Sequence, residues 1–107
     1  MNKIIIAKDF TEKPGARYIK EGEFSGELFR NDYLEPKFLC ARKKQEKLII
    51  DLDGAFGYAT SFLEEAFGGL SRIYGSDSVL KTIEIECEDE PSLIVEIKDY
   101  IKSAEEE

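Results

Sequence analysis

Three short apolar runs along the chain predict the strands of a small sheet. Residues 3–7 contain three consecutive isoleucines, and residues 47–52 are almost continuously apolar. Both patterns are typical of strands that are buried on both faces. Residues 82–88 instead alternate between apolar and polar positions, which indicates a strand with one exposed face. We expect 47–52 to be central and 82–88 to lie nearer an edge, where its glutamates discourage pairing with another chain.

Apolar residues that recur at three- and four-residue spacing predict the clearest helix, from Phe62 to Tyr74. Gly75 follows as a natural C-terminal stop. Gly68 and Gly69 lie inside this helix, where each glycine costs about 1 kcal/mol relative to alanine. Close packing of the helix against the sheet or a neighbouring helix explains such a pair. The alternative is a contact surface where the backbone of a partner approaches closely.

A second helical region begins at Ser25, because serine is a good N-cap residue. Pro36 interrupts its apolar stripe, and a proline inside a helix removes a hydrogen bond and clashes with the preceding turn. We therefore expect two helical pieces, over 26–33 and 36–44. Pro91 is predicted to open a last helix, since proline is tolerated at the first helical position.

The alternation of strands and helices predicts a single α/β domain that spans residues 1–107. Residues 17–19 are expected to form a short additional strand. The sheet is therefore predicted to be small, with three or four strands, mixed or mostly parallel, and packed against the helices. Connections between its parallel strands should be right-handed.

Composition and charge narrow the classes of function. The chain carries 15 basic and 23 acidic residues, a formal charge of −8, and this argues against a nucleic-acid partner. It has no histidine, so the commonest general base and metal ligand is missing, and we expect no metal and no cofactor. Cys40 and Cys87 are expected to be reduced, partly buried thiols. The apolar run near the N-terminus is too short for a signal peptide or a membrane span, which predicts a cytoplasmic protein.

The candidate site is the loop and helix start that follow the central strand. Ser61 and Glu64 have the spacing of a capping box, which explains Ser61 structurally. The functional alternative is that Thr60 or Ser61 accepts a phosphate, because a helix N-terminus favours an anion. Glu64 and Glu65 would repel that phosphate, which would make it a disruptive switch.

Acidic residues around the same loop raise the alternative of an enzyme. Carboxylates at Asp51, Asp53, Glu64 and Glu65 are of the type that performs acid–base chemistry or holds Mg²⁺. However, the sequence contains no glycine-rich phosphate loop, no nucleophile elbow and no Cys–His pair. We expect a non-enzymatic protein and keep a carboxylate-based hydrolase as the weakest hypothesis.

Several segments resemble the bacterial STAS-like domain family. They are Asp9-Phe10, PGARY at 14–18, SGELFR at 25–30, LDGAFGY at 52–58 and SFLEEAFGGL at 61–70. The resemblance implies a fold related to the STAS domains of anti-sigma-factor antagonists. There, a strand leads to a loop that ends in a phosphorylatable Ser or Thr, and a histidine-kinase-like ATPase binds that surface. The resemblance places Thr60 at the phosphoacceptor position, with Ala59 and Phe62 where an aspartate and a glycine are expected.

Two hypotheses follow for the function. The first is a regulatory signalling module that makes protein–protein contacts through residues 57–65, with a histidine-kinase-like ATPase as the partner. Its phosphoacceptor candidates are Thr60 and Ser61, and its partner-binding candidates are Gly57, Tyr58, Phe62, Glu64 and Glu65. The second is a small-ligand or nucleotide sensor that uses the same loop, with Arg17 reaching an anion. The sequence does not determine the oligomeric state.

Overall fold

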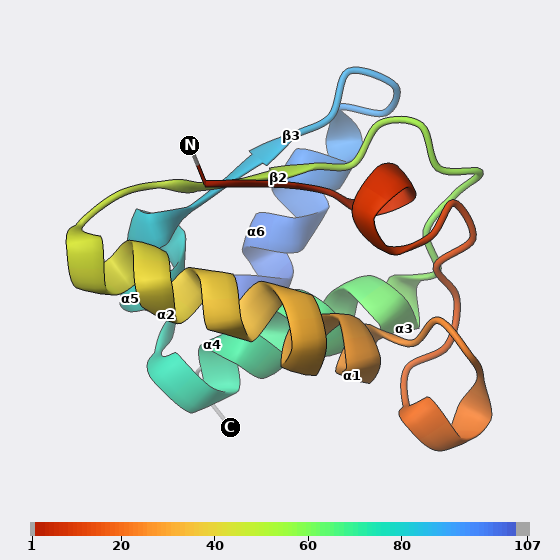
Figure 1. Cartoon of the computed structure of the whole chain (residues 1–107), viewed down its shortest axis with the longest axis horizontal. Coiled ribbons are helices and arrows are strands. Elements are labelled where there is room, and N and C mark those ends of the chain that lie inside the picture. The colour runs from red at the N-terminus through yellow and green to blue at the C-terminus, as the bar shows by residue number, and fades with distance from the viewer. Residues whose placement is uncertain (1, 105–107) are drawn as a thin grey trace.

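The computed structural model describes residues 2–104 and contains one parallel sheet of three strands (Figure 1). The strands are β1 (Lys3–Ile5), β2 (Leu48–Asp51) and β3 (Ile83–Glu86), in the order β1-β2-β3. Both strand pairs are parallel. The predicted α/β fold is confirmed, as are the central place of β2 and the edge position of β3.

The first strand is shorter than its isoleucine run predicts. It ends at Ile5, and residues Ile6–Phe10 form a π-helical turn, η1, closed by the Thr11 N–H and the Ile6 carbonyl at 2.8 Å. Asp9 turns back and accepts a hydrogen bond from the Ile5 N–H at 2.8 Å. The prediction that this strand is buried on both faces was also wrong. Ile4 is buried on one face, whereas Lys3 on the other face is exposed. β1 is therefore a short edge strand.

Residues 26–44 form one continuous helix rather than two pieces. It consists of α1 (Gly26–Phe29), the π-helical segment η3 (Arg30–Leu34) and α2 (Glu35–Lys44). In η3 the Glu35 N–H bonds to the Arg30 carbonyl five residues back, which widens the turn just before Pro36. The wide turn leaves room for the proline ring, and it brings Phe29 and Leu34, five residues apart, to the same buried side. Ser25 caps the helix as predicted, with its Oγ accepting from the Leu28 N–H at 3.0 Å.

The helix after β2 begins at Thr60 and is made of α3 (Thr60–Leu63), the π-helical segment η4 (Glu64–Gly68) and α4 (Gly69–Tyr74). It stops at Gly75, as predicted, because that residue has a φ of 92°, which favours glycine. The chain then forms α5 (Ser76–Thr82), which the sequence analysis missed. Its few buried apolar side chains gave no helical stripe, and Thr82, expected in the strand, ends this helix.

The two glycines of this helix allow close contacts with neighbouring side chains. A β-carbon at Gly69 would overlap Nη1 of Arg30, which comes from η3. A β-carbon at Gly68 would lie 2.6 Å from Oε2 of Glu64 and 3.5 Å from the β-carbon of Ala104. The two glycines are therefore explained by close packing of this helix against its neighbours, as the first of the two interpretations predicted.

The loop between η1 and α1 contains no strand at 17–19. Ile19–Glu21 form a single 3₁₀ turn, η2. Hydrogen bonds fasten the loop to the start of α1, from the Gly26 N–H to the Ala16 carbonyl at 2.8 Å and from the Glu27 N–H to the Arg17 carbonyl at 3.0 Å. These local bonds take the backbone groups that a strand would have used.

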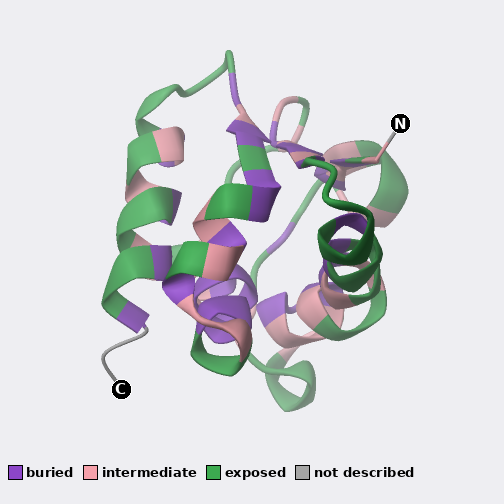
Figure 2. Ribbon diagram, turned by 90° about the vertical axis from the view of Figure 1, so that its left-hand side faces the viewer, coloured by how far each residue is buried: buried purple, intermediate pink, exposed green. Residues whose placement is uncertain are grey.

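The last predicted helix is present as α6 (Ser92–Ala104), and it starts one residue after Pro91, which was expected to be its first residue. The long helices lie on one side of the sheet (Figures 1 and 2). Between helices and sheet lies the core, which includes Ile4, Phe29, Phe38, Leu48, Ile50, Phe62, Leu63, Phe67, Leu70, Ile85, Ile97 and Ile101.

Cys87 is buried in this core, whereas Cys40 is exposed on α2, contrary to the expected partial burial of both thiols. Over residues 2–104, none of the helices has the length and apolar character needed to cross a membrane.

Candidate functional site

The loop between β2 and α3 is fixed by carboxylates at the carboxyl end of the sheet. Asp53 accepts hydrogen bonds from the N–H groups of Glu88 and Asp89, both at 2.9 Å, in the loop after β3. Asp89 in return accepts from the Gly54 N–H at 3.1 Å. The two loops therefore hold each other through an exchange of side-chain-to-backbone bonds.

Asp53 is stabilised in its charged form by these contacts. The backbone N–H groups of Asp89 and Glu88 lower the pKa of its carboxyl group below the ordinary value. Asp51 makes a further local bond, in which its Oδ1 accepts from the Asp53 N–H at 2.9 Å. Both acids thus shape the loop.

Phe56 is displayed at the tip of this loop, with 76% of its surface exposed. Its N–H donates to the Glu12 carbonyl at 2.8 Å, and the ammonium group of Lys13 lies 5.8 Å from its ring centroid. Farther along, the Tyr58 hydroxyl donates to the Leu52 carbonyl at 2.7 Å, and burial raises the pKa of that hydroxyl. The loop therefore presents an exposed aromatic ring on a backbone that is tied down at several points.

The helix start at Thr60 differs from the predicted capping box. Ala59 is the N-cap residue, and no side chain caps this end. Ser61 lies one residue inside the helix and is half-buried, and Thr60 is exposed. The capping role assigned to Ser61 was wrong because the helix starts at Thr60, two residues earlier than the pattern suggested. Of the two hydroxyls, Thr60 is the accessible one.

Glu64 and Glu65 belong to a cluster of ion pairs with three arginines. Arg17 Nη1 lies 2.6 Å from Glu64 Oε1 and 3.4 Å from Glu65 Oε1. Arg72 Nη1 lies 2.7 Å from Glu64 Oε2, and Arg30 Nη1 lies 2.6 Å from Glu65 Oε2. Hydrogen bonds from Arg72 and Arg17 lower the pKa of Glu64 despite its partial burial. The cluster joins the 11–25 loop, η3 and the helix after β2.

The predicted partner-binding residues therefore separate into two groups. Gly57 is exposed and Tyr58 half-buried beside Phe56, at the loop. Phe62 is fully buried among aromatic rings, and Glu65 is 8% exposed, so neither belongs to an accessible surface. Arg17, the anion-binding candidate, has its guanidinium group on Glu64 and Glu65.

Sequence reasoning missed Phe56, Asp89, Arg30 and Arg72. Phe56 was detectable, because it is a large apolar residue between two loop glycines. Arg30 and Asp89 gave no signal, since their contacts span 35 residues. Arg72 pairs with Glu64 eight residues earlier in the same helix, which is not one of the usual three- or four-residue spacings. Among the described residues, no three His, Cys, Asp or Glu side chains gather in a way that could hold a metal ion.

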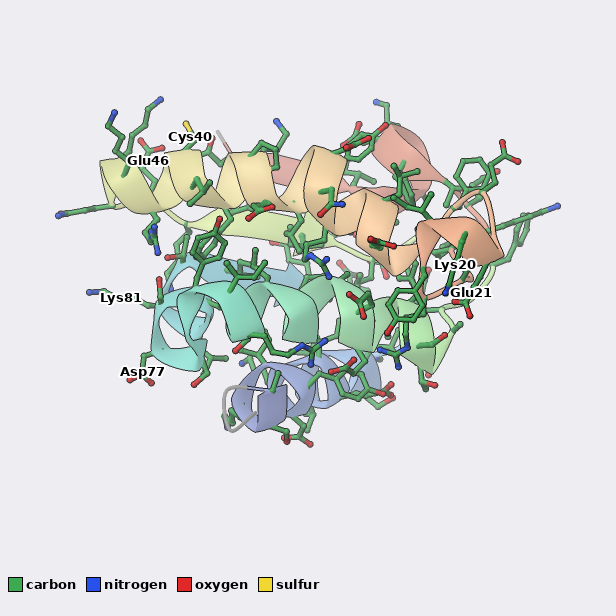
Figure 3. All side chains as sticks on the ribbon, turned by 90° about the horizontal axis from the view of Figure 1, so that it is seen from below. Lys20, Glu21, Cys40, Glu46, Asp77 and Lys81 are labelled. Atoms are coloured by element: carbon green, nitrogen blue, oxygen red, sulfur yellow. The ribbon has the colours of Figure 1, made fainter. Side chains whose placement is uncertain are left out.

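Clefts also occur away from this loop. One of about 780 Å³ lies by the amino ends of β2 and β3, lined by Arg42, Gln45, Glu46, Lys47, Asp77, Ser78, Lys81 and Thr82. Glu46, Asp77 and Lys81 mark its position in Figure 3, far from the end of the molecule where Lys20 and Glu21 lie. Its basic groups are partly engaged, since Lys47 Nζ donates to the Lys81 carbonyl at 2.8 Å.

Comparison with curated proteins and with solved structures finds no match. A family model does match, over residues 25–93, and its description is STAS-like domain of unknown function (DUF4325). The matched segment includes the central strand, the loop with Phe56 and the helix that begins at Thr60. The chain therefore belongs to this family of STAS-like domains.

Proposed function

We propose that this protein is a non-enzymatic regulatory module of the cytoplasm that binds a protein partner through one surface. That surface, the loop surface, consists of Phe56, Gly57, Tyr58 and Thr60. The observation that carries the proposal is the phenylalanine ring of Phe56, 76% exposed on a tethered loop.

An exposed aromatic residue on a fixed backbone has the properties of an interface anchor. Aromatic side chains supply much of the binding energy at protein interfaces when a partner buries them. Binding costs less entropy when the loop is already ordered, and here Asp53, Asp89 and the Glu12 carbonyl hold it. The loop surface therefore offers a large apolar side chain on a backbone that is already held in place before a partner binds.

Thr60 supplies a site at which such binding can be regulated. Its side chain is exposed on the first turn of the helix, four residues before Glu64. A phosphate there adds about 1.5 to 2 negative charges at the edge of the loop surface. The family resemblance supports a histidine-kinase-like ATPase as the partner that binds this surface and modifies the hydroxyl.

The binding test uses the purified chain and candidate histidine-kinase-like ATPases from the same organism. Isothermal titration should show a complex that Phe56→Ala weakens about tenfold or more. Val95→Ala is the matched control, because Val95 is also an exposed apolar residue, 63% exposed, but lies on α6. A complex that tolerates Phe56→Ala as well as Val95→Ala would refute the loop surface as the binding site.

The phosphorylation test uses the same two proteins with Mg²⁺-ATP. Mass spectrometry should find one phosphate on Thr60, lost in Thr60→Ala and kept in Ser61→Ala, since Ser61 is half-buried. Thr60→Glu should weaken the complex. Phosphate on Ser61 alone, or a complex that is indifferent to Thr60→Glu, would contradict the proposed switch.

The nucleotide-sensor alternative has less support. Arg17, its anion-binding residue, already pairs with Glu64 at 2.6 Å. A ligand phosphate would have to compete with that carboxylate. Thermal stabilisation of the chain by a nucleotide, lost in Arg17→Ala, would favour this alternative over the protein-binding module.

A further inference from the structure

Among residues 2–104, the direction in which the chain winds leaves one face of the sheet without helices. The strand order β1-β2-β3 means that both connections step the same way across the sheet. Because such connections are right-handed, they place their helices on the same face. Figure 1 shows the long helices on one side of the sheet, and Figure 2 shows the same arrangement from the side. Parallel sheets are usually covered on both faces, so this open face is unusual.

The paired residues of the three strands place six side chains on this open face, in two rows, and we call it the outer face. One row runs from Lys3 through Ile49 to Glu84, and the other from Ile5 through Asp51 to Glu86. The two isoleucines are half-buried and lie diagonally across neighbouring strands. The outer face therefore has an apolar centre with charged residues around it.

The charges of the outer face are mainly negative. Its six side chains include three carboxylates and one ammonium group, that of Lys3. The Lys3 Nζ lies 3.9 Å from Asp51 Oδ2 and 3.6 Å from Glu86 Oε1. Glu84, at the other end of the first row, is exposed. A basic partner would complement this distribution, and an acidic one would be repelled.

The dimensions of the outer face fit one helix. Neighbouring strands are about 4.8 Å apart, so the outer two strands are separated by roughly 10 Å. An α-helix with its side chains is about 10 Å across. A second copy of the chain is a poorer fit, because the carboxylates of the two copies would meet.

We propose that the outer face binds an amphipathic helix of a partner protein, with apolar residues on one side and Lys or Arg on the flanks. The apolar side covers Ile5 and Ile49. The basic flanks pair with Glu84 and Glu86. This surface is distinct from the loop surface and is proposed independently of it.

The test uses a synthetic helical peptide of about 18 residues, long enough to form a helix, with leucines on one side and lysines on the other. Titration into the isotopically labelled full chain should move the amide NMR signals of β1, β2 and β3. Ile49→Ser, or the double change Glu84→Gln with Glu86→Gln, should weaken binding about tenfold. Because Ile49→Ser can destabilise the central strand, Ile5→Ser on the edge strand provides a second apolar variant.

The matched control for charge is Glu12→Gln with Glu23→Gln. Both are exposed glutamates outside the sheet, and their replacement changes the net charge by the same amount. Equal weakening by the two pairs of changes would mean non-specific attraction and would overturn the proposal. So would shifts confined to the helices, or equal binding of a peptide with glutamates in place of lysines. Self-association of the free chain that Ile49→Ser abolishes would assign the outer face to a second copy instead.

Discussion

Arg30 Nη1 donates to two oxygens of Glu65, the carboxylate Oε2 at 2.6 Å and the backbone carbonyl at 2.7 Å. The two side chains are 12% and 10% exposed, so the pair is largely withdrawn from water. It joins η3 to η4 and thereby fixes how the two long helices pack. Opposite charges attract each other strongly when they are shielded from water. Removing one partner is costly for the same reason, because the other charge is then buried without a counter-ion.

Glu65→Ala is therefore expected to be strongly destabilising. It leaves the guanidinium group of Arg30 largely buried without its carboxylate, and the free energy of unfolding should fall by about 3 kcal/mol. Urea denaturation measures the change. Glu23→Ala, at an exposed position, should stay within about 0.5 kcal/mol of the wild type. A similarly small effect of Glu65→Ala would show that the pair contributes little.

Alanine at the two adjacent glycines should have different effects. In Gly69→Ala the new β-carbon meets Arg30, which is held by Glu65 and cannot easily move, so we expect a loss of about 1–3 kcal/mol. In Gly68→Ala it meets the end of the Glu64 side chain, which is paired with Arg17 and Arg72, but these three side chains are more exposed than Arg30 and can shift together at a smaller cost. The gain in helix propensity, about 1 kcal/mol, then offsets the strain. Equal thermal denaturation midpoints for the two variants would contradict this difference.

Asp53 should make stability depend on pH in the acidic range. The pKa of the Asp53 carboxyl group is lowered in the folded state. The charged carboxylate therefore adds its full share to the free energy of unfolding when the pH is above the ordinary pKa of about 4. This stabilisation is lost as the pH falls through the folded-state pKa. Asp53→Asn should therefore be less stable than the wild type near pH 7, with a difference that shrinks below about pH 4. Urea denaturation at both pH values tests this. A difference that stays constant, or grows in acid, would mean that the Asp53 charge does not hold the two loops.

Phe56→Ala should leave the fold unchanged. The ring is mostly exposed, so its removal should change the free energy of unfolding by less than about 0.5 kcal/mol. Chemical denaturation and circular dichroism check this directly. The result matters for the binding experiment, because a stable Phe56→Ala variant ensures that weaker binding reflects the missing ring. Marked destabilisation would instead give Phe56 a structural role.

The elements with regular apolar spacing were predictable from the sequence, and those with broken spacing were not. The central strand and the helix that ends before Gly75 have continuous patterns, and both are present. Pro36 was read as a break between two helical pieces, because nothing in the sequence indicated the π-helical turn that accommodates it. α5 was missed because it buries Val79 but no stripe of large apolar residues.

The sequence predicted a helix start after the central strand, but it did not predict the contacts around that helix start. Thr60 lies at the helix start that follows the central strand, as the family resemblance implied. Arg72 reaches Glu64 along the same helix, eight residues on. Arg17 and Arg30 reach Glu64 and Glu65 only through the packing of the loop and the neighbouring helix. No local spacing encodes such contacts, whereas the local hydrogen bond at Ser25 was predictable.

The wide turn before Pro36 also constrains how this part of the chain can change in length. A π-helical turn holds one residue more than an α-helical turn, so a relative shorter by one residue between Phe29 and Leu34 would close the turn into regular helix. The core contacts on both sides would survive such a deletion. Pro36 would not fit, because its ring would then meet the carbonyl of the preceding turn. Loss of that residue and replacement of the proline should therefore occur together among relatives.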